Sequence, residues 1–206
     1  MKKVLAAGIG CIHASFVCAF AESQNQLVPV GFLTYGTFNT QRYGGENSTW
    51  HYNFNDANLN NAVSQGKVAE IEIVIGNPNQ SPGVGSALLE FALADIGSKK
   101  ASQTSRYKKV LLFTNNSKSP RMGHLVQKYG FNQTVNYQYH DSNGNNITNN
   151  LVNVQKIADS PSVSRCHLFN FDNIAQAIER TSRITNSSKI CPLKSNPQLK
   201  MWQLCK

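Results

Sequence analysis

The feature that most constrains the fold is a strand pattern that runs through a glycine-rich turn directly into a helix pattern, within residues 68–97. From Val68 to Ile75 the sequence VAEIEIVI alternates with period two, as a β-strand requires. One face of this strand carries Ala69, Ile71, Ile73 and Ile75, and the other carries Glu70, Glu72 and Val74. The stripe at helical spacing after the turn consists of Leu89, Ala92, Leu93 and Ile96, with Gly97 at the expected helix end. This order predicts a sheet strand followed by a helix that packs on it.

The turn itself, QSPGVG from Gln80 to Gly85, has the composition of an anion-binding loop. Gly83 and Gly85 let the backbone turn tightly, and the start of the following helix adds unpaired N–H donors and the positive end of the helix dipole. This arrangement favours a pyrophosphate, although the same pattern also occurs as plain turn geometry. Leu88 stands where the dinucleotide-binding fingerprint needs a third glycine, and no Gly-Lys-Ser/Thr follows, so neither a Rossmann nor a P-loop site is indicated.

The rest of the chain supplies further strands and helices, so the predicted fold class is mixed α/β (α+β), with one central sheet flanked by helices. Strands are predicted at Leu27–Phe38, Thr49–Asn55 and Val110–Thr114. The last of these should run parallel to the strand at Val68–Ile75, because a helix connects them. The other expected segments are a polar connection at Asp56–Gly66, a basic loop at Ser98–Lys109, a helix at Pro120–Tyr129, a hairpin over Thr134–Lys156 with its turn at SNGNN, and a helix at Phe171–Ile184.

The first 21 residues, MKKVLAAGIGCIHASFVCAFA, have the three parts of a secretion signal. Lys2 and Lys3 form a positive n-region, Val4–Cys18 is an apolar h-region, and Ala19–Ala21 is a small-x-small cleavage site. A signal anchor is the alternative, although the apolar stretch is short for a membrane span. We therefore expect secretion or export to a periplasm, with no membrane span after cleavage. The predicted division of the chain is a signal at 1–21, a folded domain at 22–157 and a C-terminal extension at 158–206.

The formal net charge of +9 favours binding of anionic partners such as nucleic acid or a membrane surface. The basic residues are scattered and match no nucleic-acid motif, so we expect a solvated basic surface and no nucleic-acid partner. Cleavage of the signal would leave Cys166, Cys191 and Cys205, and we predict a disulfide between the last two. No CxxC or His/Cys ligand spacing occurs, so no metal cofactor is expected.

The segment AEIEIVIGNPNQSPGVGSALLEF, from Ala69 to Phe91, resembles motif A of the GNAT family, the general-control-type N-acetyltransferases. That motif is a strand, then Gln/Arg-x-x-Gly-x-Gly/Ala, then a helix. The sequence KYGF at Lys128–Phe131 resembles the end of the family's motif B, and the whole resemblance covers residues 68–135. It implies a GNAT-like central mixed sheet, acetyl-CoA as co-substrate, and transfer of the acetyl group to an amine acceptor that the sequence does not identify.

The resemblance also implies roles for individual residues. The strand backbone would bind the pantetheine arm of acetyl-CoA, and N–H groups of the turn would bind its pyrophosphate. The cofactor-binding residues would be Ile73, Val74, Ile75, Gln80, Ser81, Gly83, Val84 and Gly85. Glu70, in an Ala-Glu-Ile context that some members share, would be the catalytic base, the alternative being a carboxylate on a solvated strand face. Tyr129 is the second candidate catalytic residue.

Two positions depart from the family's pattern. Pro82 lacks the N–H that the family normally offers there. Val126 stands where many members carry the tyrosine that protonates the leaving thiolate, and Tyr129 and His124 are its nearby substitutes. The alternative function is therefore a secreted, non-catalytic binding module on a degenerate GNAT scaffold. Because acetyl-CoA is a cytosolic metabolite, export and catalysis agree if the protein is delivered into a host cell or acts in a lumen supplied with acetyl-CoA.

Overall fold

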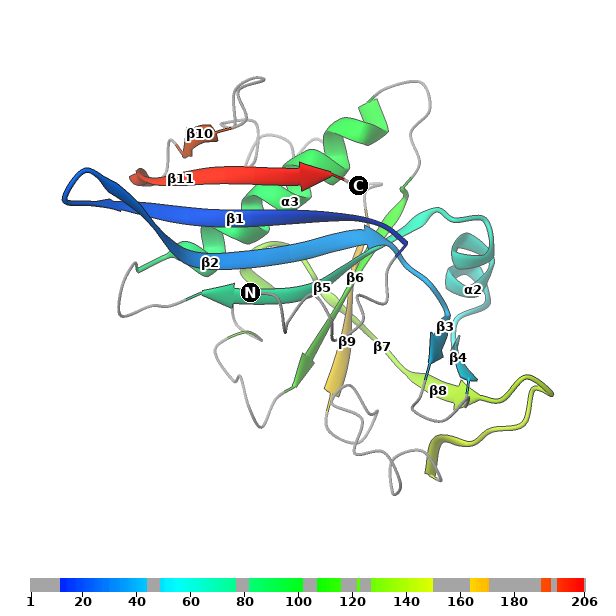
Figure 1. Cartoon of the computed structure of the whole chain (residues 1–206). Coiled ribbons are helices and arrows are strands. Elements are labelled where there is room, and N and C mark those ends of the chain that lie inside the picture. Colours follow the sequence, from blue (N-terminus) through cyan, green and yellow to red (C-terminus); the bar gives the residue numbers. More distant parts are fainter. Residues whose placement is uncertain are drawn as a thin grey trace.

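The computed structural model describes most of the N-terminal two thirds of the chain and three strands beyond it. The described residues are 12–43, 49–76, 82–101, 107–115, 122, 127–149, 164–170, 190–193 and 196–205. Figure 1 shows a long, twisted sheet with one helix lying across it and a small second sheet at one end. The predicted fold class, mixed α/β with a central sheet flanked by helices, is confirmed at this level.

The large sheet has eight strands, and the β5–β6 pair is the parallel one among the described pairings. In spatial order its strands are β10 (Ile190–Leu193), β11 (Asn196–Cys205), β1 (Ile12–Ser23), β2 (Gln26–Thr37), β5 (Val68–Gly76), β6 (Lys109–Asn115), β9 (Ser164–Asn170) and β7 (Gln133–Val135). The small sheet has the order β3 (Gln41–Tyr43), β4 (Thr49–Phe54) and β8 (Tyr137–His140). The predicted strands at Leu27–Phe38, Thr49–Asn55, Val68–Ile75 and Val110–Thr114 are confirmed, as is the parallel pairing of the last two.

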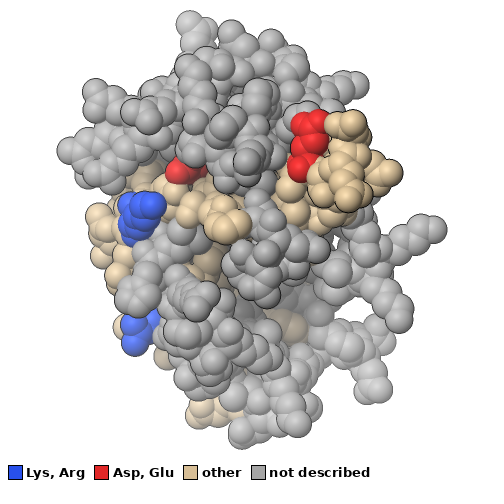
Figure 2. Space-filling model, turned by 90° about the vertical axis from the view of Figure 1, so that its left-hand side faces the viewer, with Lys and Arg blue, Asp and Glu red and all other residues tan. Residues whose placement is uncertain are grey.

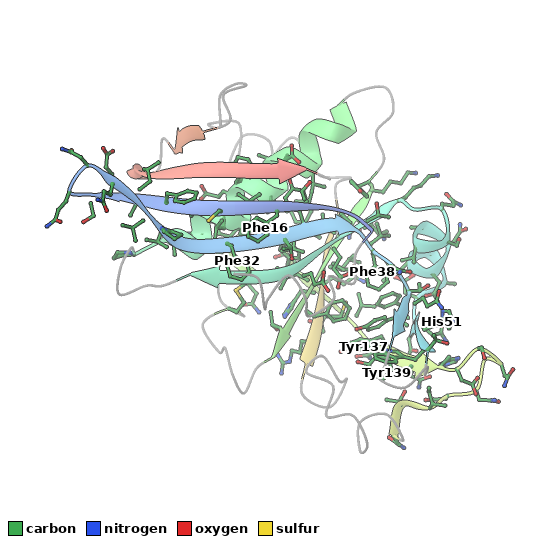
Figure 3. The ribbon with its side chains drawn as sticks, viewed as in Figure 1. Phe16, Phe32, Phe38, His51, Tyr137 and Tyr139 are labelled. Atoms are coloured by element: carbon green, nitrogen blue, oxygen red, sulfur yellow. The ribbon has the colours of Figure 1, made fainter. Side chains whose placement is uncertain are left out.

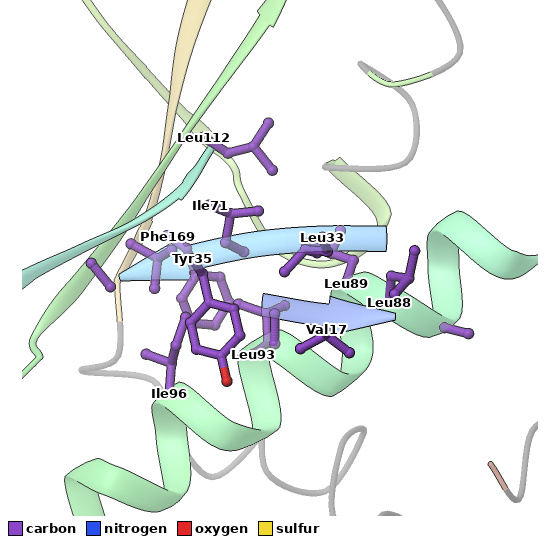
Figure 4. Close-up of a cluster of buried hydrophobic side chains, with 14 of the residues drawn as sticks. Val17, Leu33, Tyr35, Ile71, Leu88, Leu89, Leu93, Ile96, Leu112 and Phe169 are labelled. Carbon is purple, nitrogen blue, oxygen red and sulfur yellow. The ribbon is translucent and has the colours of Figure 1, made fainter. Parts of the chain in front are cut away.

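One face of the large sheet is covered by helix α3 (Val84–Ala101). The predicted stripe is buried, and Figure 4 shows Leu89, Leu93 and Ile96 packed toward Leu33 and Tyr35 of β2. The predicted helix end at Gly97 is wrong, because α3 continues to Ala101. The apolar stripe stops at Ile96, but the lysines and alanine that follow Gly97 favour helix, so the backbone continues where the pattern ends.

The opposite face of the large sheet packs against the small sheet through a second, aromatic core. Tyr52 lies at its centre, with ring centroids 5.2 Å from Tyr139, 5.5 Å from Tyr137 and 5.4 Å from Phe113. Figure 3 shows Phe38, Tyr137 and Tyr139 gathered between the two sheets. The rings of Tyr139, Tyr137 and Phe113 meet that of Tyr52 in edge-on or tilted arrangements, which aromatic quadrupoles favour. The large sheet is therefore buried on both faces where β5, β6 and β9 lie.

Helix α2 (Ala57–Ser64) occupies the segment that the sequence predicts as a polar connection, so that prediction is wrong. Asp56 caps the helix, since its carboxylate Oδ1 accepts a hydrogen bond from the Leu59 backbone N–H at 3.0 Å. Leu59 and Val63, four residues apart, are buried in the aromatic core. Two large apolar residues, with two alanines and three asparagines around them, gave too weak a periodicity to indicate a helix.

The N-terminal segment that resembles a secretion signal contains most of strand β1. β1 lies between β2 and β11 and pairs with both, from Ile12 to Ser23 on one edge and from Ser15 to Ala21 on the other. Val17 and Ala19 are fully buried under α3. A chain cleaved after Ala21 would lack the part of β1 that carries these residues.

The remaining predictions fall on the C-terminal half of the chain. The predicted hairpin is divided at Asn136: β7 pairs with β9 in the large sheet, whereas β8 pairs with β4 in the small one. Its turn is present, closed by the His140–Asn146 bridge. The predicted helix at Phe171–Ile184, the return of the hairpin and most of the predicted helix at Pro120–Tyr129 lie outside the described residues.

Residues 158–206, which the sequence sets apart as an extension, supply β9, β10 and β11 to the same large sheet. The backbone register pairs Cys191 with Met201, so Cys205 lies four residues further along β11. At a rise of about 3.3 Å per residue this puts the two cysteine Cα atoms roughly 13 Å apart, whereas a disulfide needs less than about 7 Å. The predicted Cys191–Cys205 disulfide does not fit this register.

Candidate functional site

The strands β5 and β6 part in the middle of the large sheet. Their parallel ladder runs from the pair Val68–Lys109 to the pair Ile71–Leu112, and among the described pairings it ends there. β5 continues to Gly76 and stays paired with β2 on its other edge, up to the pair Gly31–Gly76. Figure 1 shows the two strands diverging toward their C-terminal ends. The sheet thus opens beside β5 at residues 73–76, which include Ile73, Val74 and Ile75, the predicted pantetheine-binding backbone.

A β-bulge lies where the two strands begin to part. In the β2–β5 register Tyr35 pairs with Ile71 and Thr34 pairs with Ile73, so Glu72 is the extra residue of β5. A bulge bends its strand and increases the local twist, which turns β5 away from β6 at this point. The extra residue also interrupts the period-two alternation that the sequence predicts to run unbroken from Ala69 to Ile75. The tertiary structure thus adds an irregularity that the sequence pattern does not reveal.

The glycine turn leads from the open end of β5 into α3. Gly83 has a φ of +82°, and its carbonyl accepts a hydrogen bond from the Ala87 N–H at 3.0 Å, so it is the residue on which the helix begins. A Cβ at Gly83 would meet no atom within 4 Å, so its conformation and not crowding requires glycine. Val84 and Gly85 form the first turn of α3, whose N–H groups have no partner within the helix.

Three members of the predicted phosphate-binding set can therefore be placed, and two cannot. Gly83, Val84 and Gly85 lie at the start of α3, whereas Gln80 and Ser81 lie outside the described residues. Pro82 is described and exposed, and as a proline it offers no N–H to an anion. The site that the described residues can form is an anion cradle made of helix N–H groups beside an opened sheet.

Glu70, the predicted base, is buried. It is 3% exposed and pairs with Gly36 on β2 and Leu111 on β6. Because Leu111 belongs to the aromatic core, Glu70 lies on the sheet face opposite α3. The alternative interpretation, a carboxylate on a solvated strand face, is wrong. Buried carboxylates are uncommon and occur where they are bonded or used, which keeps Glu70 as the leading catalytic candidate.

Tyr129, the second predicted catalytic residue, lies over the first turns of α3. Its hydroxyl donates a hydrogen bond to Glu90 Oε1 at 2.5 Å. Burial and this bond to Glu90 raise the pKa of Tyr129 to about 12, against a smaller opposing effect of a hydrogen bond with Ser86. The phenol is therefore protonated at neutral pH and near the start of the helix that follows the glycine turn. Val126 and His124, the other positions considered for this role, lie outside the described residues.

A buried pair that the sequence does not reveal lies on β6 and β9. Thr114 Oγ1 and His167 Nε2 are hydrogen-bonded at 2.8 Å, and both side chains are buried. Burial, and secondarily the positive charge of Arg165, lower the pKa of His167, so its imidazole is neutral at pH 7. Thr114 is two residues past the last β5–β6 pair, so the bonded pair borders the opening. The two residues are 53 positions apart, and the sequence contains no motif that links them.

The rest of the described surface and interior offers little further chemistry. In the face shown by Figure 2, the described basic side chains form separate spots and no continuous patch. Across the described ranges, no group of three or more His, Cys, Asp or Glu side chains is arranged to hold a metal ion. Likewise, no helix in the described part of the chain is both long and apolar enough to span a bilayer.

Comparison of the chain with protein-family models, with curated proteins and with solved structures finds no match. The assignment of a function therefore depends on the residues themselves and on the geometry of the opening between β5 and β6.

Proposed function

We propose that the protein is an acetyl-CoA-dependent N-acetyltransferase that binds the cofactor in the opening between β5 and β6. The observation that carries this proposal is the end of the β5–β6 ladder at the Ile71–Leu112 pair, on the strand that precedes the glycine turn and α3 in the chain. A strand whose edge leaves its neighbour can form backbone hydrogen bonds to an extended, amide-containing molecule. The pantetheine arm of coenzyme A is such a molecule. The resemblance to the GNAT motifs implies that this arm binds along the backbone of residues 73–75.

We infer that the phosphates of the cofactor bind at the start of α3. β5 ends at Gly76 and α3 begins at Val84, so this helix is the next described element of the chain after the open strand. Unpaired N–H groups and the helix dipole favour a pyrophosphate there. Together, the open strand edge and the helix start match the two ends of one elongated ligand.

The proposed reaction is direct transfer. The amine nitrogen attacks the thioester carbon, so that an N–C bond forms and the C–S bond breaks. Glu70 takes the proton that leaves the nitrogen, and the thiolate of coenzyme A takes up a proton to become the thiol. A backbone N–H of β5 near Val74 would stabilise the oxyanion of the tetrahedral intermediate. Tyr129, protonated at neutral pH, can act as the acid toward the thiolate only if its hydroxyl leaves Glu90.

The proposal refers to the full-length chain. β1 borders β2, and β2 holds the bulged strand β5, so loss of Ile12–Ala21 would remove the support of the strand that forms the site. A protein that keeps this segment keeps the support of the site. The predicted export stays a prediction, and it agrees with catalysis where the protein reaches a compartment that contains acetyl-CoA.

The test is calorimetric titration of the full-length protein with acetyl-CoA and with coenzyme A. We expect micromolar binding that is lost in Gly83→Trp, because the indole would fill the space in front of the helix start. Gly66→Trp is the matched control: Gly66 also has a positive φ, +64°, and its Cβ would likewise meet no atom within 4 Å, but it lies at the end of α2.

Two outcomes would contradict the proposal. If acetyl-CoA at millimolar concentration does not bind, the fold serves a non-catalytic role, and the exposed Pro82 in the turn would be a physical reason for it. If acetyl-CoA binds and both tryptophan variants lose binding equally, the loss reflects backbone strain at a positive φ and not a ligand at the glycine turn.

A further inference from the structure

The hydroxyl of Thr34 is a buried polar group without a partner. The side chain is 1% exposed, and among the described residues Oγ1 has no hydrogen-bond partner. Burying a hydroxyl without a hydrogen bond costs stability, so such groups are rare in native proteins and each one calls for an explanation. A hydroxyl that is reserved for a bound molecule is one such explanation, and its position decides whether it applies.

Thr34 lies on the same face of the sheet as Glu70. Leu33 and Tyr35, its neighbours on β2, both belong to the core under α3, so Thr34 is on the opposite face. Gly36, two residues further along β2, shares that face and pairs directly with Glu70. Thr34 and Glu70 are therefore diagonal neighbours across two strands, at a typical separation of about 7–8 Å.

Thr34 also faces the bulge. In the β2–β5 register the extra residue, Glu72, falls between the partners of Thr34 and Tyr35. The opening between β5 and β6 begins at the far edge of β5, and β5 itself lies about 4.8 Å from β2 in the hydrogen-bonding direction. A molecule in the opening, on the face of Glu70, would reach the Thr34 hydroxyl by extending across β5 and displacing the side chains that bury Thr34. Gly36, between the two, contributes no side chain that would stand in the way.

An aromatic pair continues this face toward β1. Phe16 pairs with Thr34 in the β1–β2 register, and its ring stacks on that of Phe32 with centroids 5.5 Å apart and planes inclined by 26°. Both rings are half-buried, so each keeps an exposed part. Figure 3 shows this pair on the β1–β2 hairpin, away from the aromatic core at Tyr137 and Tyr139. The hydroxyl of Thr34 is thus flanked by a carboxylate on one side and an apolar surface on the other.

We propose that Thr34 contacts the acceptor and that the acceptor is a primary amine with an apolar substituent. The hydroxyl Oγ1 accepts a hydrogen bond from the amine N–H, which aims the nitrogen lone pair at the thioester while Glu70 takes the proton. The substituent lies on Phe16 and Phe32, where its contact is hydrophobic. This inference deepens the proposed acetyltransferase function and rests on it.

The first test measures stability and needs no substrate. Thr34→Val keeps the shape of the side chain and removes the orphan hydroxyl, so it should raise Tm by about 3 °C. The matched control is Thr37→Val on the same strand, because the buried Thr37 hydroxyl is bonded to Tyr107 at 2.7 Å and its loss should lower Tm. If Thr34→Val lowers Tm as much as Thr37→Val, the Thr34 hydroxyl has a structural partner and the inference is wrong.

The second test measures acetyl transfer by the full-length protein to 2-phenylethylamine, with ethanolamine as the polar comparison. We expect the aromatic amine to be preferred, and Thr34→Val to raise its KM about tenfold while the KM of acetyl-CoA stays unchanged. Thr34→Ser keeps the hydroxyl and should keep the KM of the amine near the wild-type value. A merely structural role of Thr34 would not produce this separation of the two KM values.

The outcomes distinguish this inference from the proposed function. If acetyl-CoA binds but neither amine is acetylated, or ethanolamine is preferred, the acceptor assignment is overturned and the cofactor site stands. If the KM of the amine is unchanged in Thr34→Val, only the proposed contact between Thr34 and the acceptor is contradicted. If acetyl-CoA does not bind at all, the proposed function fails, and the acceptor assignment fails with it.

Discussion

β1 and β5 are both interior strands of the same sheet, but only one of them is held along both edges. β1 pairs with β2 and β11 over most of its length, and Val17 and Ala19 of this strand are fully buried. β5 pairs with β2 throughout, whereas its ladder with β6 stops after four pairs, next to a bulge. We therefore expect changes in β1 to affect folding, and changes along β5 to affect the proposed binding and catalysis.

The largest expected effect is the loss of β1. A chain that begins at Glu22 should show no cooperative thermal unfolding, because it lacks a strand from the middle of the sheet and leaves the edges of β2 and β11 unpaired. Circular dichroism during heating, with the full-length protein as reference, measures this. A cooperative transition in the shortened chain would show that β1 is dispensable and that cleavage after Ala21 is compatible with the fold.

A matched pair of substitutions refines this test within β1. Val17→Asp places a carboxylate in the core under α3 and should lower the free energy of unfolding by more than about 4 kcal/mol. Ser23→Asp, at the end of the same strand where the chain is exposed, should change it by less than about 0.5 kcal/mol. Urea denaturation of both variants measures the difference, and equal effects would contradict the scaffold role of β1.

On β5 the expected effect is on the reaction. Glu70→Gln keeps the size of the side chain but cannot accept a proton, so kcat/KM for acetyl transfer should fall about 10²–10⁴-fold while acetyl-CoA binding stays intact. Glu72→Gln, at the bulge two residues away, is the control and should cost less than tenfold. A chromogenic assay of free coenzyme A thiol measures kcat/KM for both variants. Equal losses of kcat/KM in the two would contradict the assignment of Glu70 as the base.

A smaller effect is expected at the turn after β5. Gly83→Ala should lower the free energy of unfolding by about 1–2 kcal/mol, because an alanine is strained at a φ of +82°. Gly66→Ala, at a φ of +64°, should cost about the same. Only the change at Gly83 should also weaken acetyl-CoA binding in a titration. If both alanine variants bind acetyl-CoA as the wild type does, the backbone at Gly83 is not part of the cradle.

The smallest expected effect is a pH dependence of stability that arises from His167, next to β6. The pKa of His167 is lowered by burial. The imidazole is therefore protonated near pH 6.5 in the unfolded chain, but only at lower pH in the folded protein. The neutral imidazole therefore contributes fully to the free energy of unfolding above pH 6.5, and this contribution is lost as the pH falls toward the pKa of His167 in the folded protein. Urea unfolding between pH 7.5 and 5 should show this decline, and a His167→Gln variant should show a weaker one. An identical decline in the variant would assign it to other groups.

The strand, turn and helix at residues 68–101 could be predicted from the sequence because their signals are local. Alternation over eight residues, a glycine that needs a positive φ and a stripe at helical spacing each specify the backbone within one or two turns. The sequence did not predict the end of α3 or the helix α2, because the local signal is weak in both places. Past Gly97 and between Asp56 and Gly66 the apolar signal is sparse, and helix propensity and the Asp56 cap decide instead.

The sequence alone is enough to predict that β5 is a strand, that Gly83 lies in a turn before a helix and that α3 packs on the sheet, because these features depend on neighbours along the chain. The position of Ile12–Ser23 as a sheet strand follows from its pairing with β2 and β11, because an apolar run of that length suits a leader as well as a buried strand until its partners are known. It also brought Thr34 beside Glu70, Thr114 beside His167, and a bulge to Glu72. Such arrangements depend on register between distant strands, which no local pattern encodes.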